Sequence, residues 1–226
     1  MASNCWKGDE HQNDVSTLLS HRGARLRWPA KAEAEFLEDL GFSRVVIKND
    51  QEEAIKALND NVRLFGVELV PEESPVADSA ANGVAERSVQ VVEKLLRTMK
   101  LALEHRLGET VQMEHPLISW LIRHTTDTRN KFHVYRDGRT AYELWRGRPY
   151  RGVVTEFGAK VHFRLPRRRG GNLRARWAQG IWLGKTRRSD EHILWNGERV
   201  TKSRSIRGMP DSEVWGADML EGIDAK

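Results

Sequence analysis

Two acidic residues of this chain stand in contexts that suit metal-assisted chemistry. Asp50 directly follows a short run of β-branched residues, Glu86 stands at the start of a long amphipathic stretch, and 35 residues separate them. Two-metal phosphoryl transfer needs carboxylates that converge from different elements, because two divalent ions roughly 4 Å apart must be bridged and charge-balanced. The spacing alone is not specific, since the chain has 32 acidic residues. An acidic residue in the first turn of a helix also complements the helix dipole.

Helix and strand patterns alternate around these two residues. We expect Asp50 at the carboxyl end of a strand and Glu86 in the first turn of a long helix. The stretch 71–83 between them contains two prolines and an Asn-Gly pair, which predicts a flexible loop. Such alternation is typical of an α/β fold. In chain order, the pattern predicts a helix over 29–40, a strand over 44–48, a helix over 52–65, an edge strand over 67–70 and a helix over 84–104.

The pattern changes in the second half of the chain. Helical stretches are predicted over 116–122 and 139–146, and Gly147 ends the second one. After Pro149, turn sequences at 169–172 and at Asn196-Gly197 separate short segments that alternate with period two. This region is predicted to be a small all-β, SH3-like barrel with strands over 159–165, 175–183, 191–195 and 198–204.

Positive charge is concentrated in this second half. Residues 127–207 contain 21 Lys and Arg against 7 Asp and Glu, while the whole chain has a formal charge of +5 and a pI near 9.5. A concentrated basic face binds phosphate backbones through the release of counterions, whereas dispersed charge would be enough for solubility. Because this part has no basic amphipathic helix of the kind that binds membrane surfaces, nucleic acid is the predicted partner.

The composition excludes several other classes of protein. No stretch approaches the roughly 18 consecutive apolar residues of a membrane span, and the first residues lack the apolar run of a signal peptide. The single cysteine, Cys5, excludes an internal disulfide and a zinc site built on a Cys-x-x-Cys pair. We expect an intracellular protein with no membrane partner, nuclear if it is functional.

Five segments resemble the integrase of copia-type retroelements. Ile47-Lys-Asn-Asp50-Gln-Glu and Asn82-Gly-Val-Ala-Glu86-Arg are similar to the motifs around the second and third acidic residues of the D,D-35-E core, whose name matches the 35-residue interval. The resemblance covers about residues 30–210, with the motifs in the family's order. Three later segments are similar to those that join such a core to its downstream barrel: Thr140-Ala-Tyr-Glu-Leu-Trp-Arg-Gly-Arg148, Glu156-Phe-Gly-Ala-Lys-Val161 and Gly180-Ile-Trp-Leu-Gly184.

This resemblance implies a ribonuclease-H-like α/β core followed by the SH3-like barrel. It implies that Asp50 and Glu86 are two of three catalytic carboxylates in a two-metal site that takes Mg²⁺ or Mn²⁺. The implied reaction is hydrolytic trimming of a DNA end and attack of its 3′-hydroxyl on target DNA, which is DNA integration by strand transfer. The stretch 71–83 would correspond to the flexible active-site loop.

Basic residues in two places are predicted to contact double-stranded DNA. On the long helix they are Arg87, Lys94, Arg97 and Lys100, for which a solvated helix face is an equally good interpretation. Arginine on a small barrel suits phosphate contacts, which position a duplex without reading its sequence. Trp182 and Trp195 are predicted to lie in the barrel core. The predicted DNA-binding residues of the barrel are Arg164, Arg167, Arg168, Arg169, Arg174, Arg176, Arg187 and Arg188.

The chain departs from the family's pattern near its start. The family's first catalytic Asp lies on a strand some tens of residues before the second, whereas Asp9 and Asp14 lie in a polar segment and Asp39 in a predicted helix. We therefore expect an N-terminally truncated integrase that binds DNA and is inactive alone. Two alternatives remain open. One is a non-catalytic nucleic-acid-binding module, and the other is a polyprotein fragment that acts when complemented by a complete core or as a homo-oligomer.

The same patterns divide the chain into successive regions. The first residues are polar and aperiodic, which is typical of disorder. We expect a disordered lead-in over 1–28, a partial integrase catalytic core over 29–127, a linker with a short helix over 128–150, the basic barrel over 151–208 and a tail over 209–226.

Overall fold

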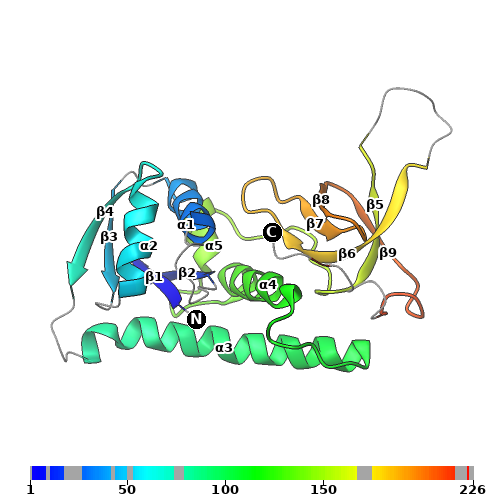
Figure 1. The fold of residues 1–226 in the computed structure, drawn as a ribbon, viewed down its shortest axis with the longest axis horizontal. Helices are drawn as coiled ribbons and strands as arrows, with labels where there is room; N and C mark the ends of the chain where they lie inside the picture. Colours follow the sequence, from blue (N-terminus) through cyan, green and yellow to red (C-terminus); the bar gives the residue numbers. More distant parts are fainter. Residues whose placement is uncertain are drawn as a thin grey trace. The chain divides into compact units, whose positions relative to one another are not determined.

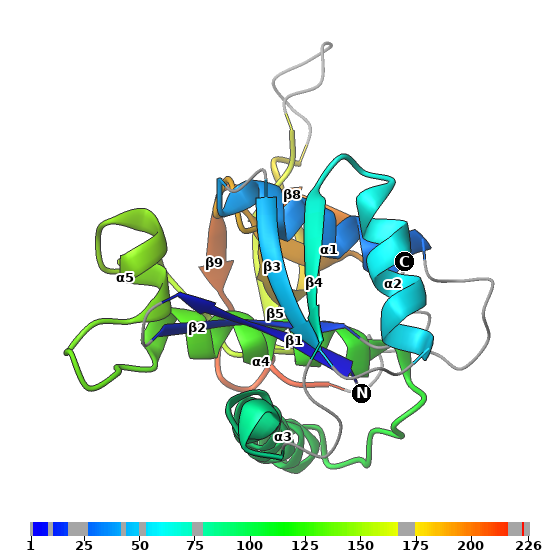
Figure 2. The same ribbon diagram turned by 90° about the vertical axis from the view of Figure 1, so that its left-hand side faces the viewer.

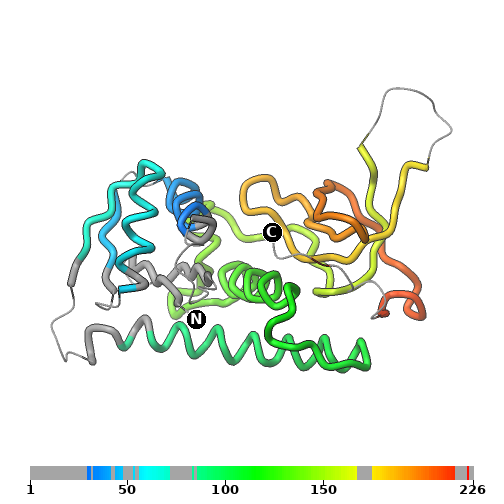
Figure 3. The backbone as a smooth tube through the Cα atoms, in the orientation of Figure 1, coloured from blue at the N-terminus to red at the C-terminus, as the bar shows by residue number. Residues whose placement is uncertain are grey.

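The computed structural model describes residues 2–8, 11–17, 27–41, 44–49, 53–73, 79–166, 175–216 and 223, and Figure 3 follows the backbone. The chain forms two compact units. Unit 1 consists of Met1–Lys94 and Thr126–Tyr150, and unit 2 of Leu95–Thr125 and Arg151–Lys226. Two of these boundaries fall inside helices, so the units differ from the regions expected from the sequence.

Unit 1 contains a parallel β-α-β segment (Figure 2). Strand β3 (Arg44–Asn49) pairs with β4 (Glu68–Glu73), from Arg44 opposite Glu68 to Asn49 opposite Glu73, and helix α2 (Glu53–Arg63) connects them. Parallel strands need such a crossover because the chain must return to the end where the first strand began. The carboxyl ends of β3 and β4 therefore meet at one edge, and Asp50, outside the described residues, directly follows β3.

Apolar side chains of these elements form the core of unit 1. Phe36 and Leu37 of α1 (Arg27–Asp39) are buried as the helical stripe predicts, and Gly41 after the helix has a left-handed φ of 82°. Strand alternation buries Val45 on one face of β3 and leaves Val46 52% exposed on the other. The cluster also includes Ala30, Ala34, Ile47, Leu58, Val62, Val67 and Leu69.

The expected disordered lead-in contains a β-hairpin, which corrects that prediction. Strands β1 (Ala2–Gly8) and β2 (His11–Thr17) pair antiparallel, from Ala2 opposite Thr17 to Gly8 opposite His11. The prediction depended on the scarcity of apolar residues. Backbone hydrogen bonds of an antiparallel ladder do not need an apolar pattern, and a two-residue connection suits a tight hairpin.

Helix α3 (Ser79–Leu107) begins earlier than predicted, and the 71–83 loop is correspondingly shorter. Residues 71–73 of the predicted loop belong to β4 and residues 79–83 belong to α3, while residues 74–78 lie outside the described part of the chain. Alanine has the highest helix propensity, so Ala80 and Ala81 favour the early start. Proline is tolerated on an edge strand, as at Pro71. Glu86 is therefore the eighth residue of α3 and does not lie in its first turn.

Helix α5 (Ala141–Arg146) confirms the short helix predicted before Gly147. Thr140 and Glu143 form a capping box: Oγ1 of Thr140 accepts from the N–H of Glu143 at 3.1 Å, and Oε2 of Glu143 accepts from the N–H of Thr140 at 2.7 Å. Gly147 ends the helix with a φ of 68°. The indole N–H of Trp145 donates to the carbonyl of Asp39 at 2.7 Å and so joins α5 to the end of α1.

Unit 2 contains a five-stranded antiparallel sheet in the order β8-β7-β6-β5-β9 (Figure 1). The four predicted strands and the Asn196-Gly197 turn are confirmed, and Oδ1 of Asn196 accepts from the N–H groups of Glu198 and Arg199 at 3.1 and 2.9 Å. Among the described residues no ladder joins β8 to β9, so closure into a barrel stays a prediction. The strands are β5 (Lys160–Arg164), β6 (Trp177–Lys185), β7 (His192–Trp195), β8 (Val200–Ser203) and β9 (Ile206–Gly208).

Both faces of this sheet carry apolar cores. One face packs Ile181 and Leu183 against Leu96 and Leu103 of α3 and against the first half of α4 (Pro116–Phe132). Trp182 is 0% exposed and Trp195 3%, which confirms the prediction that both tryptophans are buried. The opposite face packs Val161, Phe163, Trp182 and Leu194 together.

No helix in the described part of the chain has the length and apolar character needed to cross a membrane.

Candidate functional site

Of the two predicted metal ligands, Glu86 is described by the structure. Asp50 is outside the described residues and follows β3, and the Glu86 side chain is exposed on α3. Carboxylates are the donor type that Mg²⁺ prefers. The described ranges contain no group of three or more His, Cys, Asp or Glu side chains that could hold a metal ion. The assignment of Asp50 and Glu86 as metal ligands thus stays a prediction.

The four basic residues predicted on α3 fall into two groups. Arg87, Lys94 and Arg97 are exposed, although Lys94 also makes a further polar contact. Lys100 is half-buried, and its ammonium donates to a carboxylate oxygen of Glu104. The hydrogen bond from Lys100, followed by one from the N–H of Val111 at 2.8 Å, lowers the pKa of Glu104 below its ordinary value. The charge of Lys100 is thus offset within the protein, which suits it less to a phosphate.

A basic face lies on the sheet of unit 2. We use this name for four residues that the register places together: His162 and Arg164 on β5, Trp177 on β6 and Arg207 on β9. Arg164 stands opposite Trp177, and His162 stands opposite Arg207. The alternate residues of β5, Val161 and Phe163, are buried in the core of the other face. The sheet itself therefore fixes which side chains this face presents.

A cation–π contact crosses the basic face. The guanidinium carbon of Arg207 lies over the Trp177 ring, 4.2 Å from its centroid. Trp177 is half-buried, and Arg164 and Arg207 are exposed. Within the described ranges neither arginine has a carboxylate partner. Arg207 was not predicted to bind DNA because β9 was not predicted; the available signal was the arginine that directly follows Arg204-Ser-Ile.

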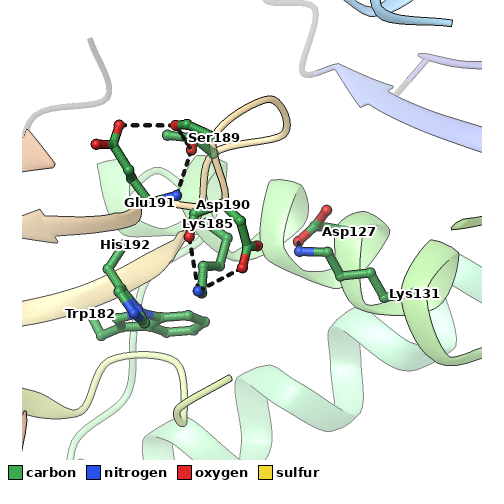
Figure 4. A network of polar contacts seen from close by, with 9 residues as sticks. Asp127, Lys131, Trp182, Lys185, Ser189, Asp190, Glu191 and His192 are labelled. Atoms are coloured by element: carbon green, nitrogen blue, oxygen red, sulfur yellow. Dashed lines mark hydrogen bonds and ion pairs between the residues drawn. The ribbon is translucent and has the colours of Figure 1, made fainter. Parts of the chain in front are cut away.

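The turn between β6 and β7 presents two of the predicted DNA-binding arginines. Arg187 is half-buried and Arg188 exposed, and each makes a further polar or ring contact. Thr186 braces the turn: its N–H donates to the carbonyl of Glu191 and its Oγ1 accepts from the N–H of Glu191, both at 2.9 Å. Ser189 donates to Oε2 of Glu191 at 2.9 Å (Figure 4). These contacts hold Arg187 and Arg188 on an ordered turn.

A buried polar network lies beneath this turn (Figure 4). The ammonium of Lys185 donates to the backbone carbonyl and to Oδ2 of Asp190, at 2.9 and 3.0 Å. Asp190 has a φ of 52°, a left-handed conformation that aspartate adopts more readily than most residues. Nε1 of Trp182 donates to Nδ1 of His192 at 3.0 Å. Burial lowers the pKa of His192 to about 4, Lys185 lowers it further and Asp190 partly opposes this, so the imidazole is neutral near pH 7.

The structure describes only some of the other arginines of the barrel that are predicted to bind DNA. Arg176 is exposed immediately before β6. Arg204, which was not among the predicted DNA-binding residues, is exposed and pairs with Glu191 at 3.2 Å. Arg167, Arg168, Arg169 and Arg174 lie outside the described residues. The assignment of DNA contacts to the predicted residues thus stays a prediction.

Comparisons of the sequence with known proteins do not assign this chain to a family. No protein-family model and no curated protein matches this chain. Among solved structures, it is distantly similar to a chain in the simian T-cell lymphotropic virus intasome bound to the PP2A regulatory subunit B56 gamma. The identity is 12%, the TM-score is 0.39, and the match covers 92% of this chain and 80% of that chain. A likeness at this level carries no argument about residues or activity.

Proposed function

We propose that this chain is an integrase-derived protein of a retroelement and that it binds duplex DNA through unit 2. The observation that carries the proposal is the excess of 15 Lys and Arg over 4 Asp and Glu in residues 151–207, the part of the basic region that belongs to unit 2. Several of these arginines are exposed, including Arg164 on β5 and Arg176 immediately before β6. The motifs around Asp50 and Glu86 support the integrase origin by resemblance.

Phosphate contact is the mode of binding that this arrangement favours. Arginine presents planar donors that match phosphate oxygens, and each neutralised phosphate releases counterions. Such contacts position a duplex without reading its bases. Trp182 and Trp195, which could stack on bases if exposed, are buried. We therefore propose binding that is insensitive to sequence and strongly weakened by salt.

Titration of a labelled duplex with the purified chain, at several salt concentrations, tests this proposal. The affinity should fall linearly on a double-logarithmic plot, with a slope of about −0.9 for each phosphate contacted. Replacing Arg164, Arg176 and Arg188 together by alanine should weaken binding and make the slope shallower by about two to three units. Replacing Lys31, an exposed residue of unit 1 paired with Glu35, is the matched control and should change little. Absence of duplex binding by the unaltered chain at low salt would refute the proposal.

DNA strand transfer is a second candidate function. The observation that favours it is the end of β3 at Asn49, directly before Asp50, together with the exposed Glu86 on α3. Here Asp50 and Glu86 would hold Mg²⁺ or Mn²⁺, which supplies charge neutralisation at the phosphate. The strand-borne Asp upstream of Asp50 is Asp14 on β2, and β2 pairs with β1 in a sheet separate from that of β3 and β4. We therefore propose that the chain alone is inactive and that catalysis requires a complete core or further copies.

A strand-transfer assay separates these possibilities. The purified chain is incubated with a labelled duplex end and Mg²⁺ or Mn²⁺, alone and with an added polypeptide that carries the strand with the family's first Asp, with Glu86→Gln as the control. Transfer by the chain alone that Glu86→Gln abolishes would show that it supplies its own third ligand. Transfer only on addition would identify a complementing fragment. Salt-sensitive binding without transfer in any mixture would identify a non-catalytic nucleic-acid-binding module.

A further inference from the structure

We propose that Arg207, laid on the ring of Trp177 beside Arg164, is a built phosphate-binding site for the backbone of duplex DNA. This inference rests on the proposed DNA-binding function and deepens it. Arg207 and Trp177 are not among the residues predicted from the sequence to contact DNA, whereas Arg164 is. In this site Arg207 contacts the phosphate, and Trp177 is a positioning residue that acts through Arg207.

The register of three strands places the site on a single face. β5 lies between β6 and β9 (Figure 1). Trp177 stands opposite Arg164 on one side of β5, and Arg207 stands opposite His162 on the other side. The Arg207 side chain must therefore extend across β5 to reach Trp177, and it passes the positions of His162 and Arg164. Three strands thus contribute to one small surface.

The cation–π contact orients the guanidinium of Arg207 and leaves its N–H donors available for a ligand. A guanidinium that stacks on an aromatic ring uses its planar face, so its five N–H groups remain available at the edges. Those donors are arranged to match two oxygens of a phosphate. A free arginine loses side-chain entropy when it binds, whereas one already held on a ring loses less. Trp177 thus makes Arg207 a better phosphate ligand than an unsupported surface arginine.

The charge of the site is not neutralised within the described part of the protein. Arg164 and Arg207 have no carboxylate partner there. Other basic residues of unit 2 do have one: Lys185 pairs with Asp190 and Arg204 with Glu191. The contrast matters because a paired guanidinium must give up its carboxylate before it can bind a phosphate. Arg164 and Arg207 carry no such cost.

Duplex binding by four single variants tests the site. Arg207→Ala should weaken binding roughly five- to tenfold at 0.1 M salt and make the salt slope shallower by about one unit. Trp177→Ala should reproduce both effects, and Trp177→Phe, which keeps an aromatic face, should restore most of the affinity. Arg199→Ala is the matched control, since Arg199 is an exposed arginine of the β7–β8 turn in the same sheet. Thermal unfolding of each variant checks that the sheet is intact.

The outcomes distinguish this inference from the proposed function. If the unaltered chain binds no duplex, both fail. If it binds and Arg207→Ala keeps the full slope and affinity, only the phosphate site is overturned. Failure of Trp177→Phe to restore binding would overturn the positioning role of Trp177. A loss of binding to phosphatidylserine vesicles with DNA binding unchanged would assign the site to lipid and likewise overturn the inference.

Discussion

The carboxylate pair of unit 1 and the basic face of unit 2 differ in how the secondary structure around them positions their side chains. Asp50 follows β3 in the sequence and Glu86 lies on α3, and the described residues contain no group of three or more His, Cys, Asp or Glu side chains that could hold a metal ion. Arg164 and Arg207 are placed by strand register, which fixes the face of every alternate residue. A metal site fails when one ligand is lost, whereas a phosphate-binding surface loses affinity in small steps. Electrostatic binding of this kind therefore does not require an intact metal site.

The strongest test of this comparison perturbs the sheet that holds the basic face. A Cβ at Gly180 would lie 2.7 Å from the backbone carbonyl oxygen of Trp195 and 3.1 Å from the Phe163 ring. Gly180→Ala should therefore lower the free energy of unfolding by about 2–4 kcal/mol, measured by urea denaturation. Gly208→Ala is the control, because a Cβ there has no heavy atom within 4 Å. Equal midpoints for the two variants would show that the sheet tolerates the change and that its register is less constrained than described.

A smaller effect is expected from pH through His192. Burial lowers its pKa to about 4 from an ordinary value of 6.5. Between these pH values the unfolded chain binds a proton that the folded chain does not, so stability falls as pH decreases through this window. The expected loss between pH 7 and pH 4.5 is about 2 kcal/mol. Unfolding at a series of pH values measures it.

Two histidine variants separate this contribution from general acid effects. His192→Gln removes the titrating ring and keeps an acceptor for the indole of Trp182, so its stability should depend less on pH. His162→Gln, on the half-exposed side of β5, should keep the dependence of the unaltered chain. Identical pH profiles for the two variants would remove His192 as the cause.

In unit 1, the capping box of α5 is expected to make a smaller contribution to stability. Thr140→Ala removes the acceptor for the N–H of Glu143 and should cost about 1 kcal/mol in the free energy of unfolding. Glu143→Gln keeps the reciprocal arrangement, because glutamine also serves in a capping box, and should cost less. A larger loss for Glu143→Gln than for Thr140→Ala would contradict the assigned roles.

The smallest effect is expected at the surface of the parallel strands. Arg44 and Glu68 are paired at 3.3 Å across β3 and β4, but their side chains are 67% and 63% exposed. A double-mutant cycle with Arg44→Ala and Glu68→Ala should give a coupling energy below about 0.5 kcal/mol, and less in high salt. A coupling above about 1 kcal/mol would mean that charge contributes to holding this pair of strands together.

Much of the architecture follows from local sequence patterns. The β-branched run before Asp50, the Asn196-Gly197 turn and the burial of Trp182 and Trp195 are all predictable, because each depends on propensity or period over a few residues. Gly147 likewise ends α5 where the sequence indicates. These features are local, and the structure confirms them.

The missed features depend on pairing or on competition between neighbours. The β1–β2 hairpin has no apolar alternation, so only its backbone ladder reveals it. The start of α3 depends on two opposing preferences: Ala80 and Ala81 favour a helix, whereas Asn82 and Gly83 disfavour one. Helix propensities alone do not show which preference is stronger. The Arg207–Trp177 contact joins β9 to β6 across β5, and no linear pattern shows such a pair.

The hydrogen bond from Trp145 to Asp39 has a consequence for the order in which the chain folds during its synthesis. The two residues are 106 positions apart, and the segment Thr126–Tyr150 belongs to the same unit as the first 94 residues. At a translation rate of about 5–20 residues per second, Trp145 is added roughly 5–20 s after Asp39. Unit 1 therefore cannot complete its packing as its first half emerges from the ribosome. The β-α-β segment has to wait until the helices that follow it have been made.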